Sequence, residues 1–333
     1  YNDLAIGQAT KLTNDKLIQA ISDLFKEANI TTKNSGMSIS LRSSLMSIIT
    51  MPALDDKQLA RMIPIEARKY IPVSIKDVSL DWWVVPSSRD DRSIQGIEND
   101  REDGVKEKSK EKVGKKAKTT VDVLVVAILN DVIAMYGNVV KSMALQNNFL
   151  ELEIFSMARS TFGKQVSPTM ILDIGAGATK LAVIEYGVIK SHHIINKGSQ
   201  DITQALSRSM GISIEKAESL KIEIGLLGEA SNKQVSESIR LVINNILSEA
   251  NRALLNYQRK YNKTIGKVVL TGGGALLKGL RDIAQENMET DVVFADPFSK
   301  VVTPAFLEPM LRDAGPEFAV SIGVALRKLQ EIE

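Results

Sequence analysis

The stretch MILDIGAGATKLAV, from Met170 to Val183, places two glycines and an aspartate between two apolar, strand-like runs. A hairpin can reverse over only two residues, so this loop has more glycine and more polarity than strand reversal requires. Gly175 and Gly177 have no Cβ, so backbone N–H groups there can turn toward an approaching anion. Asp173 ends a hydrophobic strand, where its carboxylate is placed to hold a hydrated Mg²⁺. The pattern predicts a phosphate-binding turn.

The same loop has a second interpretation. A glycine-rich hairpin in which Asp173 caps its own turn would contain the same residue types. After the loop, the Thr179 hydroxyl can donate a hydrogen bond to a ligand, whereas Lys180 is not required for phosphate binding. Taken alone, the loop is therefore compatible with a binding site and with a purely structural turn.

A second glycine element lies nearer the end of the chain. In VVLTGGGALLKGL, which begins at Val268, an apolar strand runs into Gly272, Gly273 and Gly274 and then directly into a predicted helix. Such a junction places free N–H groups at the positive end of a helix dipole, which favours phosphate, although it lacks the Lys-Ser/Thr ending of a P-loop. Close packing of strand and helix is the alternative explanation. Two such turns, far apart in sequence, suit a nucleotide clamped from two sides.

The composition limits the classes of function. The chain has 333 residues, with 42 basic and 40 acidic side chains and a formal charge of +2, so no charge excess favours nucleic acid or anionic lipid. The absence of cysteine excludes disulfides, thiolate metal sites and cysteine nucleophiles. Apolar runs are shorter than the roughly 20 residues that span a bilayer, and we expect a cytoplasmic protein of two domains.

Hydrophobic periodicity predicts an α/β protein. Strands are expected at 35–52, 78–86, 119–129, 268–271 and, with a reversal at 185–187, over 169–196. Helices are expected at 13–30, 54–72, 130–149, 199–211, 213–225, 236–262 and 315–333. The charged segment 87–120 has few large apolar residues, so we expect a flexible surface loop between neighbouring strands. Pro64 should kink or divide its helix, and Trp82 and Trp83 should face opposite sides of their strand.

Three segments in the same order resemble the second half of the actin-like ATPases, the superfamily of actin, Hsp70 chaperones and sugar kinases. They are DIGAGATKLAV from Asp173, KGSQDITQALSRSMGISIEKAESLK from Lys197 and VVLTGGGALLKGL from Val268. Within that superfamily, IPIEARKYIPVSIKDVSLDWWVV from Ile63 and PEFAVSIGVALR from Pro316 are similar to the PilM family, actin-like proteins of type IV pilus assembly that are related to FtsA. The resemblance covers nearly the whole chain apart from the charged segment.

The resemblance implies an actin-like (ribonuclease H-like) two-domain α/β fold with the 1C subdomain of FtsA and PilM. Domain I is expected over 1–165, with the small subdomain inserted at about 35–150, and domain II over 166–333, with the final helix returning to domain I. The family's opening strand carries a first phosphate loop that does not appear from Tyr1 onward. We therefore expect the natural chain to begin upstream, and domain I to lack its N-terminal strands here.

The resemblance also assigns roles to single residues, with ATP and Mg²⁺ as ligands. Asp173 would hold Mg²⁺ through water, and Ala176 stands where actin has a second acid, which implies looser metal binding. Phosphate contacts would come from Gly175, Gly177, Thr179 and Gly198, ribose contacts from Glu218 and Lys221, and packing under the adenosine and α-phosphate from Gly272, Gly273 and Gly274. Glu153 matches an acid that orients the attacking water, although a glutamate beside a strand end is also commonly a solvated or capping residue.

By resemblance we expect a cytoplasmic ATP-binding scaffold, peripheral to the inner membrane, whose lobes close on ATP and present a groove to a partner. The expected partner is the cytoplasmic N-terminal tail of PilN, added as an extended peptide. Other inner-membrane platform proteins are expected to bind as well, and self-association is left open. No nucleic acid is expected, and the membrane would be reached only through partners. We leave open whether ATP is hydrolysed and expect at most a slow ATPase.

Two other functions stay open. An FtsA-like filament former that tethers itself to the membrane would end in an amphipathic helix, for which ALRKLQEIE from Ala325 is short. A small-metabolite kinase would need a catalytic aspartate in a glycine-containing loop of domain I, and none is evident between 120 and 165. His192 and His193 are neighbours on a predicted strand and face opposite ways, so they do not predict a metal site.

Overall fold

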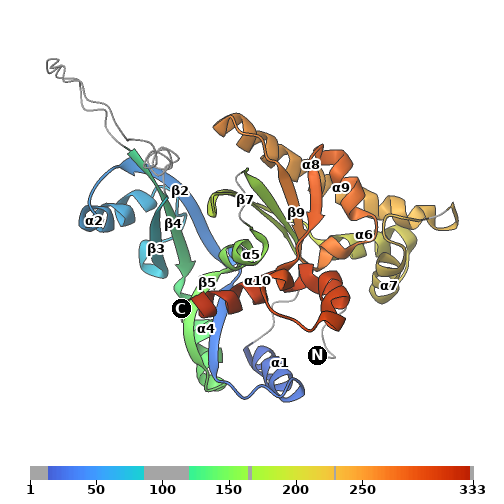
Figure 1. Ribbon diagram of the computed structural model, residues 1–333, viewed down its shortest axis with the longest axis horizontal. Helices are drawn as coiled ribbons and strands as arrows, with labels where there is room; N and C mark the ends of the chain where they lie inside the picture. The colour runs from blue at the N-terminus through green and yellow to red at the C-terminus, as the bar shows by residue number, and fades with distance from the viewer. Residues whose placement is uncertain (1–13, 86–119, 164–166, 229, 331–333) are drawn as a thin grey trace, which may run out of the picture. The chain divides into compact units, whose positions relative to one another are not determined.

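The computed structural model describes residues 14–85, 120–163, 167–228 and 230–330, and Figure 1 shows its ribbon. By its internal contacts the chain forms two compact units. The smaller unit is Ser43–Ala134, and the larger unit combines the residues before and after it. The domain limits and the inserted subdomain expected from the sequence remain predictions. The charged segment lies outside the described residues, except for Thr120.

The smaller unit is a three-stranded antiparallel sheet with one helix on its apolar face. In chain order it contains β2 (Ser44–Pro52), α2 (Asp56–Ala67), the 3-10 helix η2 (Ile75–Asp77), β3 (Val78–Val85) and β4 (Thr120–Leu129). The strand order is β2-β4-β3, and Leu59 and Ile63 of α2 belong to the core that this sheet forms. Because β3 and β4 pair antiparallel along their length, the charged segment joins neighbouring strands, as predicted.

Two local expectations concern this unit. Helix α2 runs without a break through Pro64 and ends three residues later, so the expected division of the helix is wrong. Its start is fixed by the Asp55 carboxylate, which accepts a hydrogen bond from the Gln58 N–H at 2.8 Å. The paired tryptophans do face opposite sides of β3, since Trp82 packs against the core and Trp83 is half exposed.

The larger unit contains a five-stranded mixed sheet. Its strands are β6 (Thr169–Ile174), β7 (Thr179–Glu185), β8 (Val188–Ile195), β9 (Lys267–Thr271) and β10 (Asp291–Phe294). The order is β10-β9-β6-β7-β8, with β9 parallel to both β10 and β6. Tyr186 and Gly187 both have positive φ, at 50° and 77°, which suits the tight hairpin predicted at this reversal.

Helices cover this sheet and supply most of the core (Figure 1). They are α6 (Ser199–Met210), α7 (Ile214–Ile224), α8 (Lys233–Tyr261) and α9 (Leu280–Met288), with the 3-10 helices η3 (Ala230–Asn232) and η4 (Gly273–Leu276). Helices α6, α7 and α8 match apolar periodicities read from the sequence, whereas α9 lies beyond the helix expected directly after the glycine triplet. The glycine triplet, however, leads into the four-residue η4 and not directly into an α-helix, so the expected helix dipole behind it is wrong.

The remaining elements include a two-stranded parallel sheet in the larger unit and helix α4, which begins in the smaller unit. They are α1 (Asn14–Glu27), β1 (Asn34–Ile39), η1 (Leu41–Ser43), α4 (Asn130–Ser142), β5 (Gln146–Leu152), α5 (Glu153–Thr161), η5 (Pro297–Lys300), η6 (Ala305–Leu307) and α10 (Glu308–Gln330). The helix expected over 130–149 is wrong beyond Ser142. The chain reverses at Ala144, whose φ is 50°, and the residues that follow pair with β1. The strand expected at 35–52 is likewise divided between two sheets by η1.

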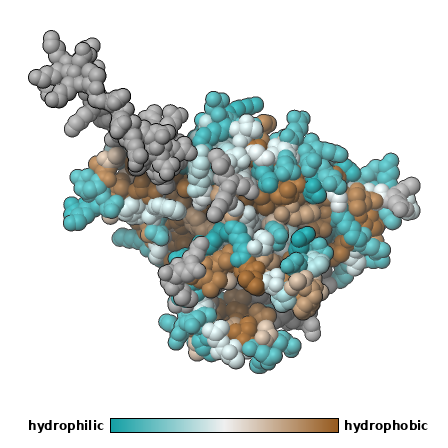
Figure 2. Space-filling model, viewed as in Figure 1, coloured by the Kyte–Doolittle hydropathy of each residue, from teal (hydrophilic) through white to brown (hydrophobic). Residues whose placement is uncertain are grey.

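Hydrophilic side chains gather over the helices at the upper right of the space-filling view, with apolar atoms emerging between them (Figure 2). Several large apolar side chains are exposed near the start of α10, among them Val302, Phe306 and Met310. No helix within the described ranges is both long enough and apolar enough to cross a membrane.

Candidate functional site

The two glycine elements lie side by side at one edge of the five-stranded sheet. β6 and β9 are parallel neighbours, with Asp173 opposite Thr271, so both strands enter their glycine turns at the same edge. Gly272 has a φ of +82°, and a Cβ on it would lie 2.3 Å from Asp173 Oδ1. A Cβ on Gly274 would lie 2.5 Å from Ile174 Cγ2. Close packing therefore requires these two glycines, in agreement with the structural interpretation of the triplet. The same close packing brings the two turns together.

The turn between β6 and β7 offers backbone donors. The Gly175 N–H closes the turn by donating to the Ala178 carbonyl at 3.0 Å. Among the hydrogen bonds of the described residues, the N–H groups of Ala176, Gly177 and Ala178 have no acceptor. Ala176 is exposed and Gly177 is partly exposed, whereas Ala178 is buried. Consecutive free N–H groups on a tight turn form a concave site suited to an anion.

A buried lysine lies between two carboxylates beside this turn. Lys180 Nζ is 2.9 Å from Asp173 Oδ2 and 3.0 Å from Glu153 Oε2. The other oxygen of Glu153 accepts hydrogen bonds from the Leu41 N–H at 2.7 Å and from the Ser40 hydroxyl at 3.0 Å. All three charged side chains of the cluster are less than 15% exposed. Glu153 is thus not the freely solvated residue that its position at a strand end also allowed.

Burial and charge act in opposite directions within this cluster. Burial raises the pKa of Asp173, and the Lys180 ammonium offsets only part of that rise. Burial lowers the pKa of Lys180, but Asp173 and Glu153 together outweigh it, so the pKa of the ammonium is raised. The lysine therefore remains positively charged throughout the physiological range.

The α6 N-terminus closes the other side of the turn. A Cβ on Gly198 would lie 2.4 Å from the Ala176 carbonyl oxygen, so the close approach of this segment to the turn requires glycine. The Ser199 and Gln200 N–H groups donate to the Gly175 and Ala176 carbonyls, both at 2.9 Å. These first N–H groups of the helix are consequently occupied by the turn and do not face a ligand.

Thr179 differs from its expected role. Its side chain is buried, and its hydroxyl donates to the Lys197 carbonyl at 2.8 Å. In this conformation the hydroxyl ties β7 to the segment before α6 and does not point to a ligand.

The two predicted ribose contacts lie together on α7. Lys221 Nζ is 2.8 Å from a Glu218 carboxylate oxygen, and it also donates to the Thr203 hydroxyl at 3.0 Å. Glu218 in turn accepts from that hydroxyl at 2.5 Å. The pair is thereby held against the first turns of α6, where the Glu218 side chain is 25% exposed and the Lys221 side chain 9% exposed.

The glycine triplet is anchored to α10. The Gly272 N–H and the Thr271 hydroxyl both donate to the Pro316 carbonyl, each at 2.8 Å. Gly273 is exposed, and a Cβ on it would lie 3.5 Å from Glu317 Oε1. Of the three glycines, only Gly273 leaves room for a side chain, and its backbone faces outward.

Sequence reasoning missed the contacts made by Lys180 and by the residues after β1. A signal was present for the lysine, because Asp173 and Lys180 lie symmetrically about the predicted hairpin turn and are therefore cross-strand partners. Nothing in the sequence indicates that Leu41 would donate to Glu153, or that Arg42 would donate to the Gly177 carbonyl at 3.1 Å. These contacts join segments more than 100 residues apart.

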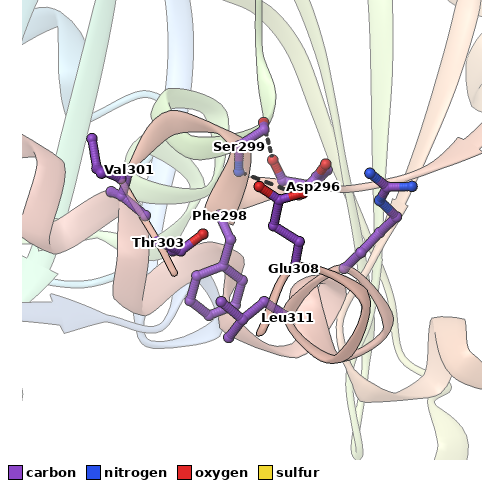
Figure 3. Close-up of a pocket in the computed structure, with 9 residues that line it drawn as sticks. Asp296, Phe298, Ser299, Val301, Thr303, Glu308 and Leu311 are labelled. Atoms are coloured by element: carbon purple, nitrogen blue, oxygen red, sulfur yellow. Dashed lines mark hydrogen bonds between the residues drawn. The ribbon is translucent and has the colours of Figure 1, made fainter. Parts of the chain in front are cut away.

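A separate cavity of about 390 Å³ lies between η5 and the start of α10 (Figure 3). Its lining includes Phe298, Leu311 and the acids Asp296 and Glu308. Asp296 is engaged in the local turn, since its carboxylate accepts a hydrogen bond from the Ser299 N–H at 3.3 Å. The cavity shares no lining residue with the glycine turns, so we treat it as distinct from the site above.

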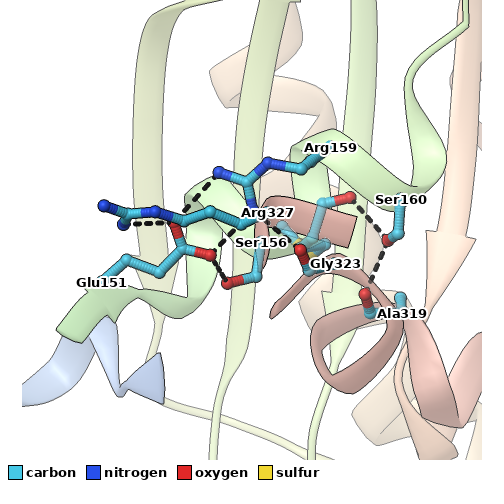
Figure 4. A network of polar contacts seen from close by, with 8 residues as sticks. Glu151, Ser156, Arg159, Ser160, Ala319, Gly323 and Arg327 are labelled. Carbon is cyan, nitrogen blue, oxygen red and sulfur yellow. Dashed lines mark hydrogen bonds and ion pairs between the residues drawn. The ribbon is translucent and has the colours of Figure 1, made fainter. Parts of the chain in front are cut away.

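A polar network fixes the start of α5 to α10 (Figure 4). Glu151 is buried and accepts from Arg159 at 2.8 Å and from Arg327 at 2.9 Å. Arg159 also donates to the Gly323 carbonyl at 2.8 Å, and the Ser156 hydroxyl donates to Glu151 at 2.5 Å. Because Glu153 lies at the junction of β5 and α5, this network holds the backbone from which its side chain projects.

Comparison with known proteins gives two kinds of match, namely FtsA sequences and solved structures. The cell division protein FtsA of Enterococcus faecalis is 29% identical over 153 residues, which are 40% of this chain and 34% of that protein. FtsA of Bacillus subtilis is 28% identical over 146 residues, 38% of this chain and 33% of that protein. The matched region thus spans about a third of the length of these relatives.

The solved structures and the family models agree with the fold. A chain of a solved PilM–PilN type IV pilus biogenesis complex superposes with a TM-score of 0.76 at 23% identity, over 94% of this chain and 84% of that chain. This likeness confirms the predicted actin-like α/β fold. The family model described as type IV pilus assembly protein PilM matches residues 3–329. By that match, which covers nearly its whole length, the chain belongs to the PilM family of type IV pilus assembly proteins.

Proposed function

We propose that the protein is an ATP-binding actin-like scaffold of the type IV pilus inner-membrane assembly platform. ATP binding is supported mainly by the turn between β6 and β7. Among the described residues, its N–H groups at Ala176, Gly177 and Ala178 have no acceptor. The accessible donors of Ala176 and Gly177, on the same turn as a lysine ammonium, suit the spread negative charge of a polyphosphate. The alternative, a turn serving only packing, does not require the donors to stay open.

The remaining contacts follow from the elements that surround this turn. Gly175, Gly177 and Gly198 would border the phosphates, with Thr179 positioning the turn through its bond to Lys197. The ribose would meet the partly exposed Glu218 and its partner Lys221. The adenosine and α-phosphate would pack on the backbone of Gly272, Gly273 and Gly274.

Hydrolysis is proposed to be slow or absent. A residue that orients an attacking water needs a free carboxylate oxygen. Oε1 of Glu153 already accepts hydrogen bonds from the Leu41 N–H and the Ser40 hydroxyl, and Oε2 accepts one from Lys180, so only one acceptor position of Oε2 is left for a water. A scaffold needs only that ATP binds one conformation more tightly than another, so weak catalysis is compatible with this function.

The proposed partner is the cytoplasmic N-terminal tail of a PilN protein. Support comes from membership of the PilM family and from the likeness to a chain of a PilM–PilN complex. The protein would then be cytoplasmic and held at the inner membrane by that tail and by other platform proteins. The tail would add as an extended peptide. FtsA-like self-association is the second candidate, favoured by the FtsA relatives.

The test is a titration of the purified protein with a synthetic PilN tail, with and without ATP. We expect ATP to bind and to change the affinity for the tail, whereas Gly272→Val, which fills the space beside Asp173, should lose both effects. Gly137→Ala is the matched control, because no atom lies within 4 Å of its new Cβ. Equal tail affinity with and without ATP would refute the gating. ATP-dependent sedimentation without tail binding would favour the filament former, and sugar-dependent ADP release would favour a kinase.

A further inference from the structure

The arrangement of Lys180 does not fit the water-held magnesium ion that the family resemblance implied. Asp173 and Lys180 are directly opposite on β6 and β7, so the sheet register itself delivers the ammonium to the carboxylate. The ammonium occupies Oδ2 of Asp173 at 2.9 Å. The other oxygen, Oδ1, lies against Gly272, where there is no room even for a Cβ.

The surroundings of this pair add no second carboxylate that is free to bind a metal. Glu153, the other nearby carboxylate, gives one oxygen to the same ammonium and the other to Leu41 and Ser40. The turn itself has Ala176 at its exposed position. A divalent cation at Asp173 would have to displace the ammonium, because both nearby carboxylates are already bonded to it. Among the described residues, no group of three or more metal-binding side chains is assembled.

We propose that Lys180 is the built-in cation of this site, so that the protein binds a nucleoside polyphosphate without needing a divalent metal. This inference rests on the nucleotide function proposed above. An ammonium has three N–H donors. Two are used by Asp173 and Glu153, and the third, together with the open N–H groups of the turn, supplies the phosphate oxygens. The two carboxylates keep the ammonium charged and fixed in place.

The first test needs no nucleotide. Lys180→Met removes the ammonium and leaves two carboxylates facing one vacated cation position, so the variant should bind Mn²⁺ at least about tenfold more tightly than the wild type. Binding is measured by electron paramagnetic resonance of free Mn²⁺. Lys180→Met/Asp173→Asn should lose the gain, and Lys180→Arg should behave as the wild type. Lys263→Met, which removes another lysine paired with a buried carboxylate, Glu185, controls for loss of an ion pair elsewhere in the same unit.

The second test compares ATP binding by the wild-type protein in Mg²⁺ and in EDTA, using isothermal titration calorimetry. The two dissociation constants should agree within about threefold, whereas Lys180→Met should bind ATP only when Mg²⁺ is present. Circular dichroism of each variant confirms that it is folded. ATP binding by the wild type in Mg²⁺ alone, or Mn²⁺ binding by the wild type as tight as by Lys180→Met, would overturn the role of Lys180. Absence of ATP binding in both buffers would overturn the nucleotide function itself, and this role with it.

Discussion

Replacing Gly323 with alanine tests how closely α10 must approach α5. A Cβ at this position would lie 1.8 Å from the Ser156 carbonyl oxygen and 2.4 Å from its carbon. Both atoms are backbone, so no side-chain rotation can relieve the overlap. The two helices must separate, and the hydrogen bond from Arg159 to the Gly323 carbonyl, 2.8 Å long, is disturbed with them.

The magnitude follows from three contributions. Overpacking a tight interface costs about 2 kcal/mol, with a range of about 1–3 kcal/mol. Loss of a hydrogen bond from a charged donor costs about 2 kcal/mol. Alanine is the better helix former by about 1 kcal/mol, which offsets part of the cost. We therefore expect the free energy of unfolding of Gly323→Ala to fall by about 3 kcal/mol. Gly137→Ala lies in α4 with open space around it, so only the propensity gain of about 1 kcal/mol applies.

The assay is urea denaturation of both variants, followed by two signals. The chain has two tryptophans, Trp82 and Trp83, and both lie in the smaller unit, so tryptophan fluorescence reports unfolding there. Far-ultraviolet circular dichroism is dominated by the helices of the larger unit. Gly323→Ala should lower the midpoint of the dichroism transition and leave the fluorescence transition nearly unchanged. A Gly323→Ala protein as stable as Gly137→Ala would refute the interface geometry.

Three further predictions concern the site and its support. Gly272→Ala forces a left-handed φ on alanine and places its Cβ against Asp173. The free energy of unfolding should therefore fall by about 1–3 kcal/mol, and calorimetry should detect no ATP binding. An unchanged affinity for ATP would contradict the proposed site. Burial raises the pKa of Glu151, but the hydrogen bonds from Arg159, Ser156 and Arg327 outweigh it and hold the pKa below its ordinary 4.5. The resulting stabilisation is present above pH 4.5 and is lost as the pH falls through the lower, folded-state pKa. The urea midpoints of wild type and Glu151→Gln should therefore differ at neutral pH and converge as the pH is lowered below 4.5, and a constant difference would be inconsistent with the ion pairs. Glu218→Gln should weaken ATP about tenfold but leave inorganic tripolyphosphate binding unchanged, and equal losses for both ligands would exclude a ribose contact.

The secondary structure was largely predictable because its causes are local. The apolar period of α6, α7 and α8 and the alternation in β6 and β7 depend only on neighbouring residues. The reversal at Tyr186 and Gly187 was recognisable for the same reason, since a tight turn needs residues that accept positive φ. Prediction failed where a distant partner decided the outcome. Residues 146–149 continue a helical pattern, yet they form β5 because β1 offers hydrogen bonds to them.

In the candidate site, too, local features were predictable and contacts with distant residues were not. Asp173 and the two glycine turns could be inferred from the residue pattern, because glycine is required wherever two backbones come into contact. The role of Gly198 came only from the family resemblance. That the two turns converge was inferred because each follows an apolar strand, and their position side by side is set by the parallel pairing of β6 with β9. The direction of the Thr179 hydroxyl was not predictable, since its acceptor is a carbonyl 18 residues away.

The sequence by itself determined that this chain is an α/β protein with two glycine turns after apolar strands, because strand period and backbone freedom are properties of short segments. Only the tertiary structure decided what lies beside the first of those turns. Glu153, Asp173 and Lys180 come from three different elements. They form one largely buried cluster only because the ends of β1, β5 and the five-stranded sheet lie close together. A carboxylate that is removed from water is stabilised by pairing with a nearby cation.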